Sequence, residues 1–141
     1  MNKLKPLPEE WSGLLNNEQK EAIENINGPL LIIAGAGSGK TRVLTYRYAH
    51  LIKTYGINFE NVLAITFTNK AANEMKDRIS DLLNLELSPK WISTFHSLCV
   101  KMLRIHGHLI GLNNNFTIYD QSDSTKLVRN CMRDSDIDTK Q

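Results

Sequence analysis

The chain has 141 residues, of which 41% are hydrophobic and 23% are charged, and its formal net charge is only +2. This length suits one compact domain, for which about 100–200 residues is usual, and the composition excludes a wholly disordered or collagen-like chain. A protein so close to neutrality has no overall basic field, so any contact with nucleic acid must be made by a local group of residues.

The sequence also bears on the compartment of the protein. The N-terminal residues 1–6 lack the apolar core of a signal peptide, and the longest aliphatic run, residues 30–34, is far too short to span a bilayer. The two cysteines, Cys99 and Cys131, stand apart without a CxxC spacing, and the single disulfide that they could form is weak evidence against a reducing, cytosolic compartment, so both are interpreted as buried or idle thiols. We therefore expect a soluble, cytoplasmic protein with no membrane partner.

The ends of the chain differ in composition from its middle. Residues 1–13 hold two prolines and a glycine among charges with no sustained period, which predicts a loosely held, flexible lead-in. The fold is expected to begin near Leu14, and residues 14–133 form the predicted domain. Residues 134–141 are polar and acidic, as in a frayed end or a linker into missing sequence.

Within the domain, short apolar runs alternate with helical patterns. A first helix is predicted from Asn16 and ends at Gly28-Pro29. The runs predicted to be strands are residues 30–34, 62–66, 91–94 and 116–119. Between the second and third runs, Thr68 or Asn69 can cap a helix with a regular apolar face. Such alternation predicts an α/β fold, with a parallel sheet covered by helices on both faces and ligands at the carboxyl ends of the strands.

A glycine-rich loop follows the first predicted strand. Ala34-Gly35-Ala36-Gly37-Ser38-Gly39-Lys40-Thr41 fits the phosphate-loop pattern GxxxxGK[ST] except that Ala34 replaces the first glycine. Glycines allow the backbone to curl with its N–H groups inward, at a helix N-terminus where negative charge is favoured. Lys40 would contact the β- and γ-phosphates, and the Thr41 hydroxyl would hold the Mg²⁺ that bridges them. The alternative, a glycine-rich turn without a ligand, does not account for the ordered strand, loop, Lys-Thr pair and helix.

The neighbouring segments resemble a known family. They are Leu15-Asn16-Asn17-Glu18-Gln19-Lys20-Glu21-Ala22, the phosphate loop followed by Arg42, Ala64-Ile65-Thr66-Phe67-Thr68-Asn69-Lys70-Ala71-Ala72, and Ser93-Thr94-Phe95-His96. In this order they closely resemble motifs of the UvrD, Rep and PcrA helicases of superfamily 1. The resemblance extends from Leu14 to about Asp123, and residues 116–120 also look like a segment of the family.

The resemblance implies a fold and an activity. The fold would be part of the first RecA-like motor domain, a P-loop NTPase three-layer sandwich built on a parallel sheet. The full-length protein would be an ATP-dependent 3′ to 5′ DNA helicase or translocase of DNA repair or replication. Its cofactors would be ATP and Mg²⁺, its track single-stranded DNA, and its remaining helicase domains would lie C-terminal to this segment.

Two further residues are expected in the nucleotide site. The amide of Gln19 offers one donor and one acceptor, which match the N6 and N7 edge of adenine and would select ATP over GTP. Alternatively, Gln19 is a polar residue on the exposed side of a short helix. Arg42 resembles the family's second nucleotide-pocket residue, although a helix arginine could equally be solvated.

The second and third motifs supply candidate DNA contacts. Phe67 follows a strand, where a base could stack on it, while Thr68, Asn69 or Lys70 would meet phosphate. Without the resemblance, Phe67 would be interpreted as a core aromatic. In the third motif, Thr94 and His96 resemble the family's DNA-contacting residues, and Thr94 can also cap the following helix.

Other polar groups on and after that helix are not assigned to sites. Lys101, Arg104 and His108 share one face, which we interpret as solvated. His106 and His108 have no partner at metal-ligand spacing, so no protein-built metal site is predicted.

One part of the hydrolytic machinery is not found in the sequence. ATP hydrolysis needs a strand ending in acidic residues and arginines from elsewhere. Residues 116–120 match such a strand only superficially, because Gln121 stands where the family has glutamate. We therefore expect a fragment that binds ATP with little or no turnover. The alternatives are a stand-alone nucleotide- or single-strand-binding module and, more remotely, a small-molecule kinase.

Overall fold

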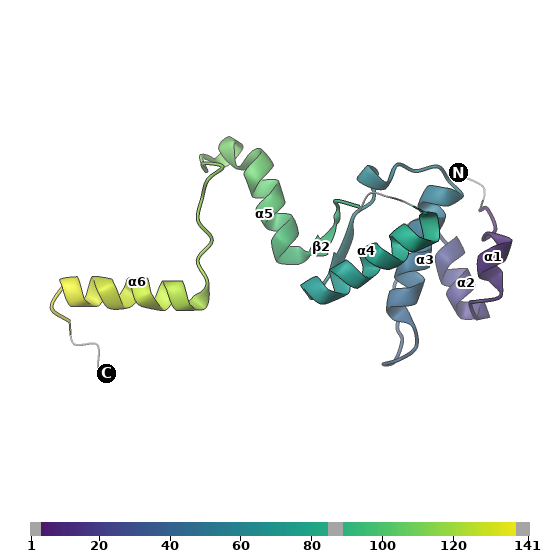
Figure 1. Cartoon of the computed structure of the whole chain (residues 1–141), viewed down its shortest axis with the longest axis horizontal. Helices are drawn as coiled ribbons and strands as arrows, with labels where there is room; N and C mark the ends of the chain where they lie inside the picture. Colours follow the sequence, from purple (N-terminus) through teal and green to yellow (C-terminus); the bar gives the residue numbers. More distant parts are fainter. Residues whose placement is uncertain (1–3, 85–88, 138–141) are drawn as a thin grey trace. The chain divides into compact units, whose positions relative to one another are not determined.

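The computed structural model describes residues 4–84 and 89–137, which fall into two compact units, residues 1–100 and 101–141. The first unit contains, in chain order, α1 (Glu9–Ser12), α2 (Asn17–Glu24), α3 (Lys40–Lys53), η1 (Phe59–Asn61), β1 (Ala64–Thr66), α4 (Asn69–Leu83) and β2 (Ile92–Thr94). Helix α5 (Phe95–His106) begins in the first unit and ends in the second (Figure 1).

The sheet of the first unit has two parallel strands joined by a helical crossover. Ala64 pairs with Ile92 and Thr66 with Thr94, and α4 packs against both strands. Thr68 begins α4, because its Oγ1 accepts the Ala71 N–H at 3.1 Å. The described residues thus form part of an α/β domain with a parallel sheet, and the helix predicted from Thr68 or Asn69 is confirmed.

Two predicted strands are not formed. Residues 30–34 and 116–119 have no strand assignment, and in the first of these runs Leu31 and Ile33 are 83% and 90% exposed. A strand is stabilised by hydrogen bonds to a neighbouring strand, and the described residues provide none beside either run. The apolar pattern therefore identified two segments that are suited to a sheet, but neither segment has a partner strand among the described residues.

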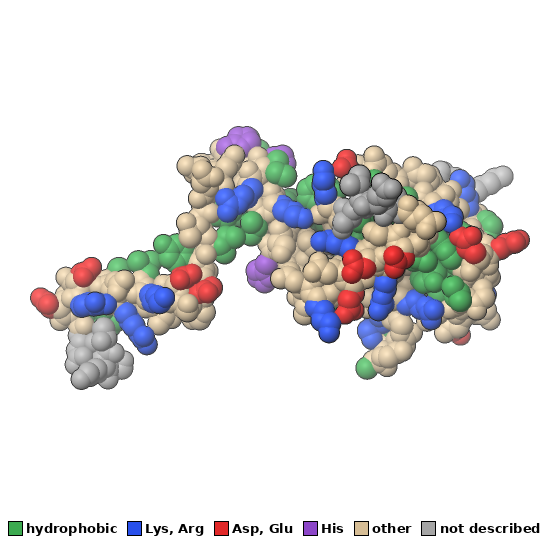
Figure 2. All heavy atoms as spheres, in the orientation of Figure 1, with side chains coloured by type: hydrophobic (Ala, Val, Ile, Leu, Met, Phe, Trp, Pro, Cys, Tyr) green, Lys and Arg blue, Asp and Glu red, His purple; other side chains and the backbone are tan. Residues whose placement is uncertain are grey.

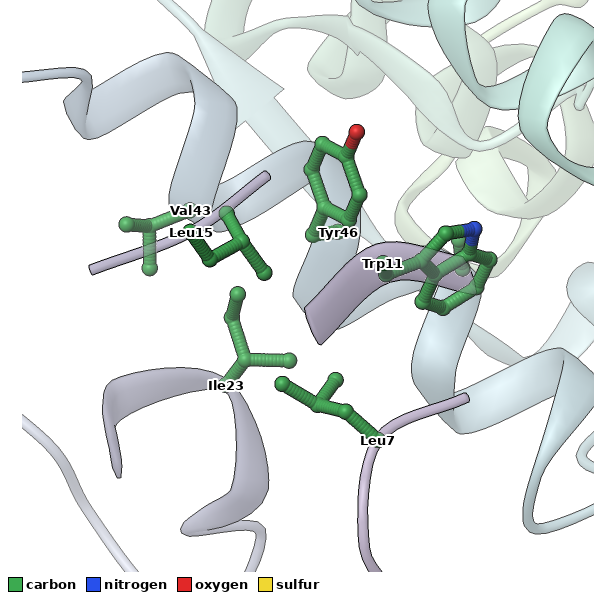
Figure 3. Close-up of a cluster of buried hydrophobic side chains, with 7 residues drawn as sticks. Leu7, Trp11, Leu15, Ile23, Val43 and Tyr46 are labelled. Atoms are coloured by element: carbon green, nitrogen blue, oxygen red, sulfur yellow. The ribbon is translucent and has the colours of Figure 1, made fainter. Parts of the chain in front are cut away.

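The N-terminal segment is packed, so the predicted flexible lead-in over residues 1–13 is wrong for the part that the structure describes. Leu7 and Trp11 are buried, and the Trp11 ring meets Tyr46 of α3 edge to face at 5.4 Å. The Lys5 N–H donates to the Tyr55 hydroxyl at 2.7 Å. Figure 3 shows Leu7 and Trp11 in one cluster with side chains of α2 and α3. The prediction failed because the prolines and charges of this segment outweighed two apolar residues, Leu7 and Trp11, that pack into the core.

Helix α3 supports two core clusters. The first cluster joins the N-terminal segment and α2 to α3; its buried members are Leu7, Trp11, Leu15, Ile23, Val43, Tyr46 and Ala49. The second joins α3 to α4 and β2 through Tyr48, Met75, Ile79 and Ile92. Burial raises the pKa of Tyr48 to about 12, and its hydroxyl donates to the Phe59 carbonyl at 3.0 Å. Helix α3, which starts at the phosphate loop, is thus held on two sides.

The second unit contains the end of α5, η2 (Gly107–Ile110) and α6 (Gln121–Asp134). Arg104 is not on a merely solvated face as predicted, because its guanidinium lies 4.6 Å from the Phe116 ring centroid and donates to the Phe116 carbonyl. Asp120 caps α6 by accepting the Asp123 N–H at 2.8 Å. Hydrogen bonds from the Asp123 backbone and from the Ser122 side chain lower the pKa of Asp120. None of the described helices is long and apolar enough to cross a membrane.

Candidate functional site

The phosphate-loop residues form an exposed turn directly before α3. Gly37 and Gly39 have φ values of +76° and +88°, a region that residues with a side chain rarely adopt. Gly39 is also the N-cap of α3, so the loop ends where the helix N–H groups are unpaired. An anion held by the loop would therefore face both the curled backbone and the positive end of the α3 dipole.

The Lys40 side chain folds back onto the start of this loop. Its Nζ donates to the carbonyls of Ala34 and Gly35 at 3.0 and 2.6 Å, and the Ser38 hydroxyl donates to the same Gly35 carbonyl at 2.7 Å. The lysine is exposed, so its ammonium can move from these neutral carbonyls to a charged phosphate. A phosphate would add the attraction of an opposite charge to the charge-assisted hydrogen bonds that the ammonium already makes. The predicted residues thus fit a polyphosphate.

Gln19 lies against the loop from α2. Its Nε2 donates to the Ser38 carbonyl at 3.1 Å, while its Oε1 accepts the Asn16 N–H at 3.1 Å. The Asn16 side chain in turn accepts the Gln19 N–H at 2.8 Å, completing a capping box. A Cβ at Gly39 would come within 2.9 Å of Gln19 Nε2, so the glycine is required for this approach. The structure thus places Gln19 against the loop.

A hollow of about 230 Å³ lies between α2 and the phosphate loop. It is lined by Asn16, Glu18, Gln19, Ala22, Ile32, Ile33, Ala34, Ser38, Lys40 and Val43. This volume is below the roughly 300–1,000 Å³ of most ligand pockets, so it can hold only part of a nucleoside triphosphate. The lining combines apolar side chains with the amide of Gln19 and the ammonium of Lys40.

Arg42 lies in the first turn of α3 and is not among the residues that line this hollow. Its guanidinium is 6.0 Å from the Tyr46 ring centroid, and it lines a second, larger hollow of about 490 Å³ between α3 and α4. The other lining residues are Thr45, Tyr46, Arg78, Asp81 and Leu82. The larger hollow includes neither Gln19 nor Lys40. The smaller hollow is lined by both, so it is the candidate nucleotide site. Thr41, the predicted Mg²⁺ residue, is exposed in the first turn of α3.

The second predicted group of residues lies where β1 ends. Phe67 is fully exposed, at 105% of the reference area, so it is not part of a core formed by the described residues. Thr68 is used as the cap of α4, and Asn69 and Lys70 are exposed in the first turn of that helix. The segment therefore presents an aromatic face beside a helix N-terminus, both suited to a nucleic-acid strand.

The third predicted group follows β2. Thr94 is buried, and its Oγ1 donates to the Ser97 hydroxyl at 2.9 Å, so the structure places this residue as an anchor of α5. His96 is exposed, and its ring meets Phe95 edge to face at 6.1 Å. Phe95, 60% exposed, is a candidate residue that sequence reasoning missed. Its position directly after a strand, like that of Phe67, was the available signal.

Charge around these groups is mixed. Figure 2 shows basic and acidic side chains interspersed over the visible face of the first unit, in keeping with the net charge of +2. Among the residues that the structure describes, no three His, Cys, Asp or Glu side chains gather in a metal-binding group. Recognition of an anionic strand would therefore depend on local contacts.

Comparison with known proteins agrees with the four ordered motifs. A family model described as the UvrD/REP helicase N-terminal domain matches residues 15–141. This chain belongs to the UvrD/REP helicase family. Its α/β structure with a parallel sheet is accordingly part of a RecA-like helicase domain.

Among the curated members of the UvrD/REP family are close relatives. The chain is 50% identical over 126 residues to the ATP-dependent DNA helicase PcrA of Staphylococcus aureus (strain Mu50 / ATCC 700699) and to that of Staphylococcus epidermidis (strain ATCC 12228 / FDA PCI 1200). In each case the match covers 89% of this chain and 17% of the relative. The chain thus spans about a sixth of the length of these helicases.

Proposed function

We propose that this chain is the ATP-binding front part of an ATP-dependent helicase or translocase that moves 3′ to 5′ along single-stranded DNA. The observation that carries the proposal is the convergence of Gln19, Ser38 and Lys40 on one hollow at the start of α3. Its family relatives are named as ATP-dependent DNA helicases. The full-length protein would act in DNA repair or replication in the cytoplasm.

The nucleotide would be held by the loop and Gln19, whereas Arg42, which the sequence also suggested for this site, lines the separate hollow between α3 and α4. The backbone N–H groups of residues 34–39 and Lys40 would bind the phosphates, and the Thr41 hydroxyl would hold Mg²⁺. Bound ATP with Mg²⁺ supplies the phosphoanhydride bond whose hydrolysis drives such motors. The chain's own contribution is to bind and orient the triphosphate in a fixed cradle at the positive end of α3.

The DNA strand would cross the carboxyl end of the sheet. Phe67 would stack a base, while Thr68, Asn69 and Lys70 would contact phosphate. His96 lies beyond the next strand, and Thr94 would hold it in place through its capping role. Stacking on an aromatic is tolerant of sequence because every base has a π face, which suits a protein that moves along DNA.

Hydrolysis by this chain alone is not part of the proposal. Asp120, in the segment that superficially resembles an acidic strand, is the cap of α6 and not the end of a strand. The acidic strand, the arginines and the remaining helicase domains would come from sequence C-terminal to this segment. We therefore expect binding of ATP and of single-stranded DNA with little or no turnover.

Equilibrium binding on the 141-residue chain tests the proposal. A fluorescent ATP analogue with Mg²⁺ and a labelled single-stranded oligonucleotide should both bind, and ATP consumption should stay near background with or without DNA. Absence of ATP binding would overturn the nucleotide assignment, and robust DNA-stimulated turnover would overturn the expected inactivity. Turnover stimulated by a small phosphoryl acceptor, but not by DNA, would instead indicate a kinase.

The gene sequence separates the helicase from the remaining alternative. A reading frame that continues past codon 141 into an acidic strand and further motor motifs supports the helicase. A stop codon at that point would support a stand-alone module that binds nucleotide or single-stranded DNA without unwinding.

A further inference from the structure

The two hydrogen bonds of Gln19 fix which way round its side-chain amide lies. The Asn16 N–H can only donate, and it meets Oε1 at 3.1 Å. The Ser38 carbonyl can only accept, and it meets Nε2 at 3.1 Å. A rotation of the amide by 180° would set donor against donor and acceptor against acceptor, leaving both hydrogen bonds unmade.

This arrangement leaves part of the amide unused. A carbonyl oxygen has two lone pairs and an amide nitrogen has two hydrogens, and one of each is taken by Asn16 and Ser38. Gln19 therefore keeps one acceptor and one donor for a ligand, in a fixed order. Gln19 also lines the hollow beside the phosphate loop, so this remaining pair is available where a nucleotide base could be read.

The fixed order distinguishes the two purines. Adenine offers a donor at N6 beside an acceptor at N7, whereas guanine offers acceptors at both O6 and N7. An oriented amide can pair with adenine at both positions, but against guanine its oxygen would face another oxygen. A freely turning side chain would give less discrimination, because its amide could turn over and donate a hydrogen bond to the O6 of guanine.

We infer that the Asn16 N–H and the Ser38 carbonyl lock the Gln19 amide in the orientation that selects ATP over GTP, with Asn16 as a positioning residue. The inference rests on the proposed binding of ATP at this site. It also ties base selection to the phosphate loop, because one of the two orienting groups belongs to the loop itself.

Asn16 allows its two roles to be separated by substitution. Its side chain caps α2 and its backbone N–H orients Gln19. N16A removes the cap and keeps the N–H, N16D keeps both, and N16P removes both. The φ and ψ of Asn16, −78° and 172°, lie in the region that proline adopts, where φ is about −65 ± 15°. The comparison of N16P with N16A therefore isolates the orienting hydrogen bond.

The experiment measures the ratio of ATP to GTP affinity for the whole chain and these three variants. We expect N16D and N16A to keep the wild-type ratio and N16P to lower it roughly fivefold, as for the loss of one hydrogen bond of ordinary strength. An equal ratio in N16P and N16A, with ATP still bound, would overturn the inference and leave the proposed function intact. A wild-type chain that binds ATP and GTP equally would overturn it as well, whereas a chain that binds neither would overturn the proposed function.

A measurement on the unaltered chain covers the case in which N16P does not fold. The nitrogen order parameter of the Gln19 side-chain amide without nucleotide should exceed about 0.8, against below about 0.6 for the exposed Gln121. A Gln19 amide as mobile as that of Gln121 would show that no lock exists. The N16A variant, which keeps both orienting groups, should retain the high value.

Discussion

Thr66 and Thr94 face each other as the last paired residues of the parallel ladder between β1 and β2. The chain therefore leaves both strands at the same edge of the sheet, and an exposed aromatic follows directly in each case: Phe67 after Thr66 and Phe95 after Thr94. Phe67 and Phe95, which are far apart in the sequence, thus follow the ends of neighbouring strands. This edge is the candidate track for single-stranded DNA.

Loss of the Phe67 ring should weaken DNA binding without affecting the fold. Because the ring is fully exposed, Phe67→Ala should leave the melting temperature unchanged but cost about 1–3 kcal/mol of single-strand binding, the usual worth of one stacked base. Phe95→Ala should act in the same direction. Fluorescence anisotropy with a labelled oligonucleotide measures the effect, and Leu109→Ala, which removes another exposed apolar side chain, is the control. Unchanged DNA affinity in both phenylalanine variants would exclude this edge as the track.

Lys40 should be needed for triphosphate binding and dispensable for folding. Lys40→Ala removes a charge-assisted hydrogen bond worth about 1.5–3 kcal/mol, so ATP affinity should fall roughly ten- to a hundredfold. The melting temperature should hardly change, because the side chain is exposed. Titration calorimetry compares this variant with Lys20→Ala, which removes the same charge from α2 outside the lining of the hollow. Equal losses in the two variants would show that Lys40 acts only through net charge.

His50 should make stability depend on pH. The side chain is fully buried and its Nε2 has no hydrogen-bond partner. Burial lowers the pKa of His50, an effect that the Lys5 backbone and Glu24 oppose and Arg47 reinforces. The folded chain thus disfavours the protonated ring relative to the unfolded chain, whose histidine titrates near about 6.5. Stability should be full above that pH and decline as pH falls toward the lowered pKa, by at most about 1.4 kcal/mol per pH unit from this group.

Urea unfolding between pH 7.5 and 5.5 measures this dependence. His50→Gln should flatten the decline, while His106→Gln, at an exposed position, should leave it as in the wild type. The same slope in all three proteins would mean that other groups control the acid sensitivity.

The N-terminal segment should contribute directly to stability. Trp11 is 3% exposed and packs on Tyr46, so Trp11→Ala should cost about 3–5 kcal/mol, the usual cost of truncating a buried aromatic. Leu4→Ala, in the same segment but at an exposed site, should change the urea midpoint little. A small effect of Trp11→Ala would mean that residues 4–13 can detach without loss of the core.

The sequence predicted best those features that depend on local chemistry. The helix predicted from Thr68 or Asn69 was confirmed. It could be predicted because its cap and its apolar face both lie within one short stretch of sequence. The pairing of residues 64–66 with 92–94 in parallel also agrees with the alternating pattern. The residues 30–34 and 116–119 were wrongly predicted as strands, because apolar periodicity reports suitability for a sheet but not the presence of a partner strand.

By itself the sequence determined the family and the phosphate loop, because both are carried by residue types at short, fixed spacing. Only the tertiary structure showed that Trp11 belongs to the core and that Asn16 and Ser38 hold the two ends of the Gln19 amide. Those relationships join residues from separate elements, and they arise when α2, the loop and α3 pack together. The orientation of the Gln19 amide is decided by the backbone groups around it, so it does not follow from the presence of a glutamine at that position.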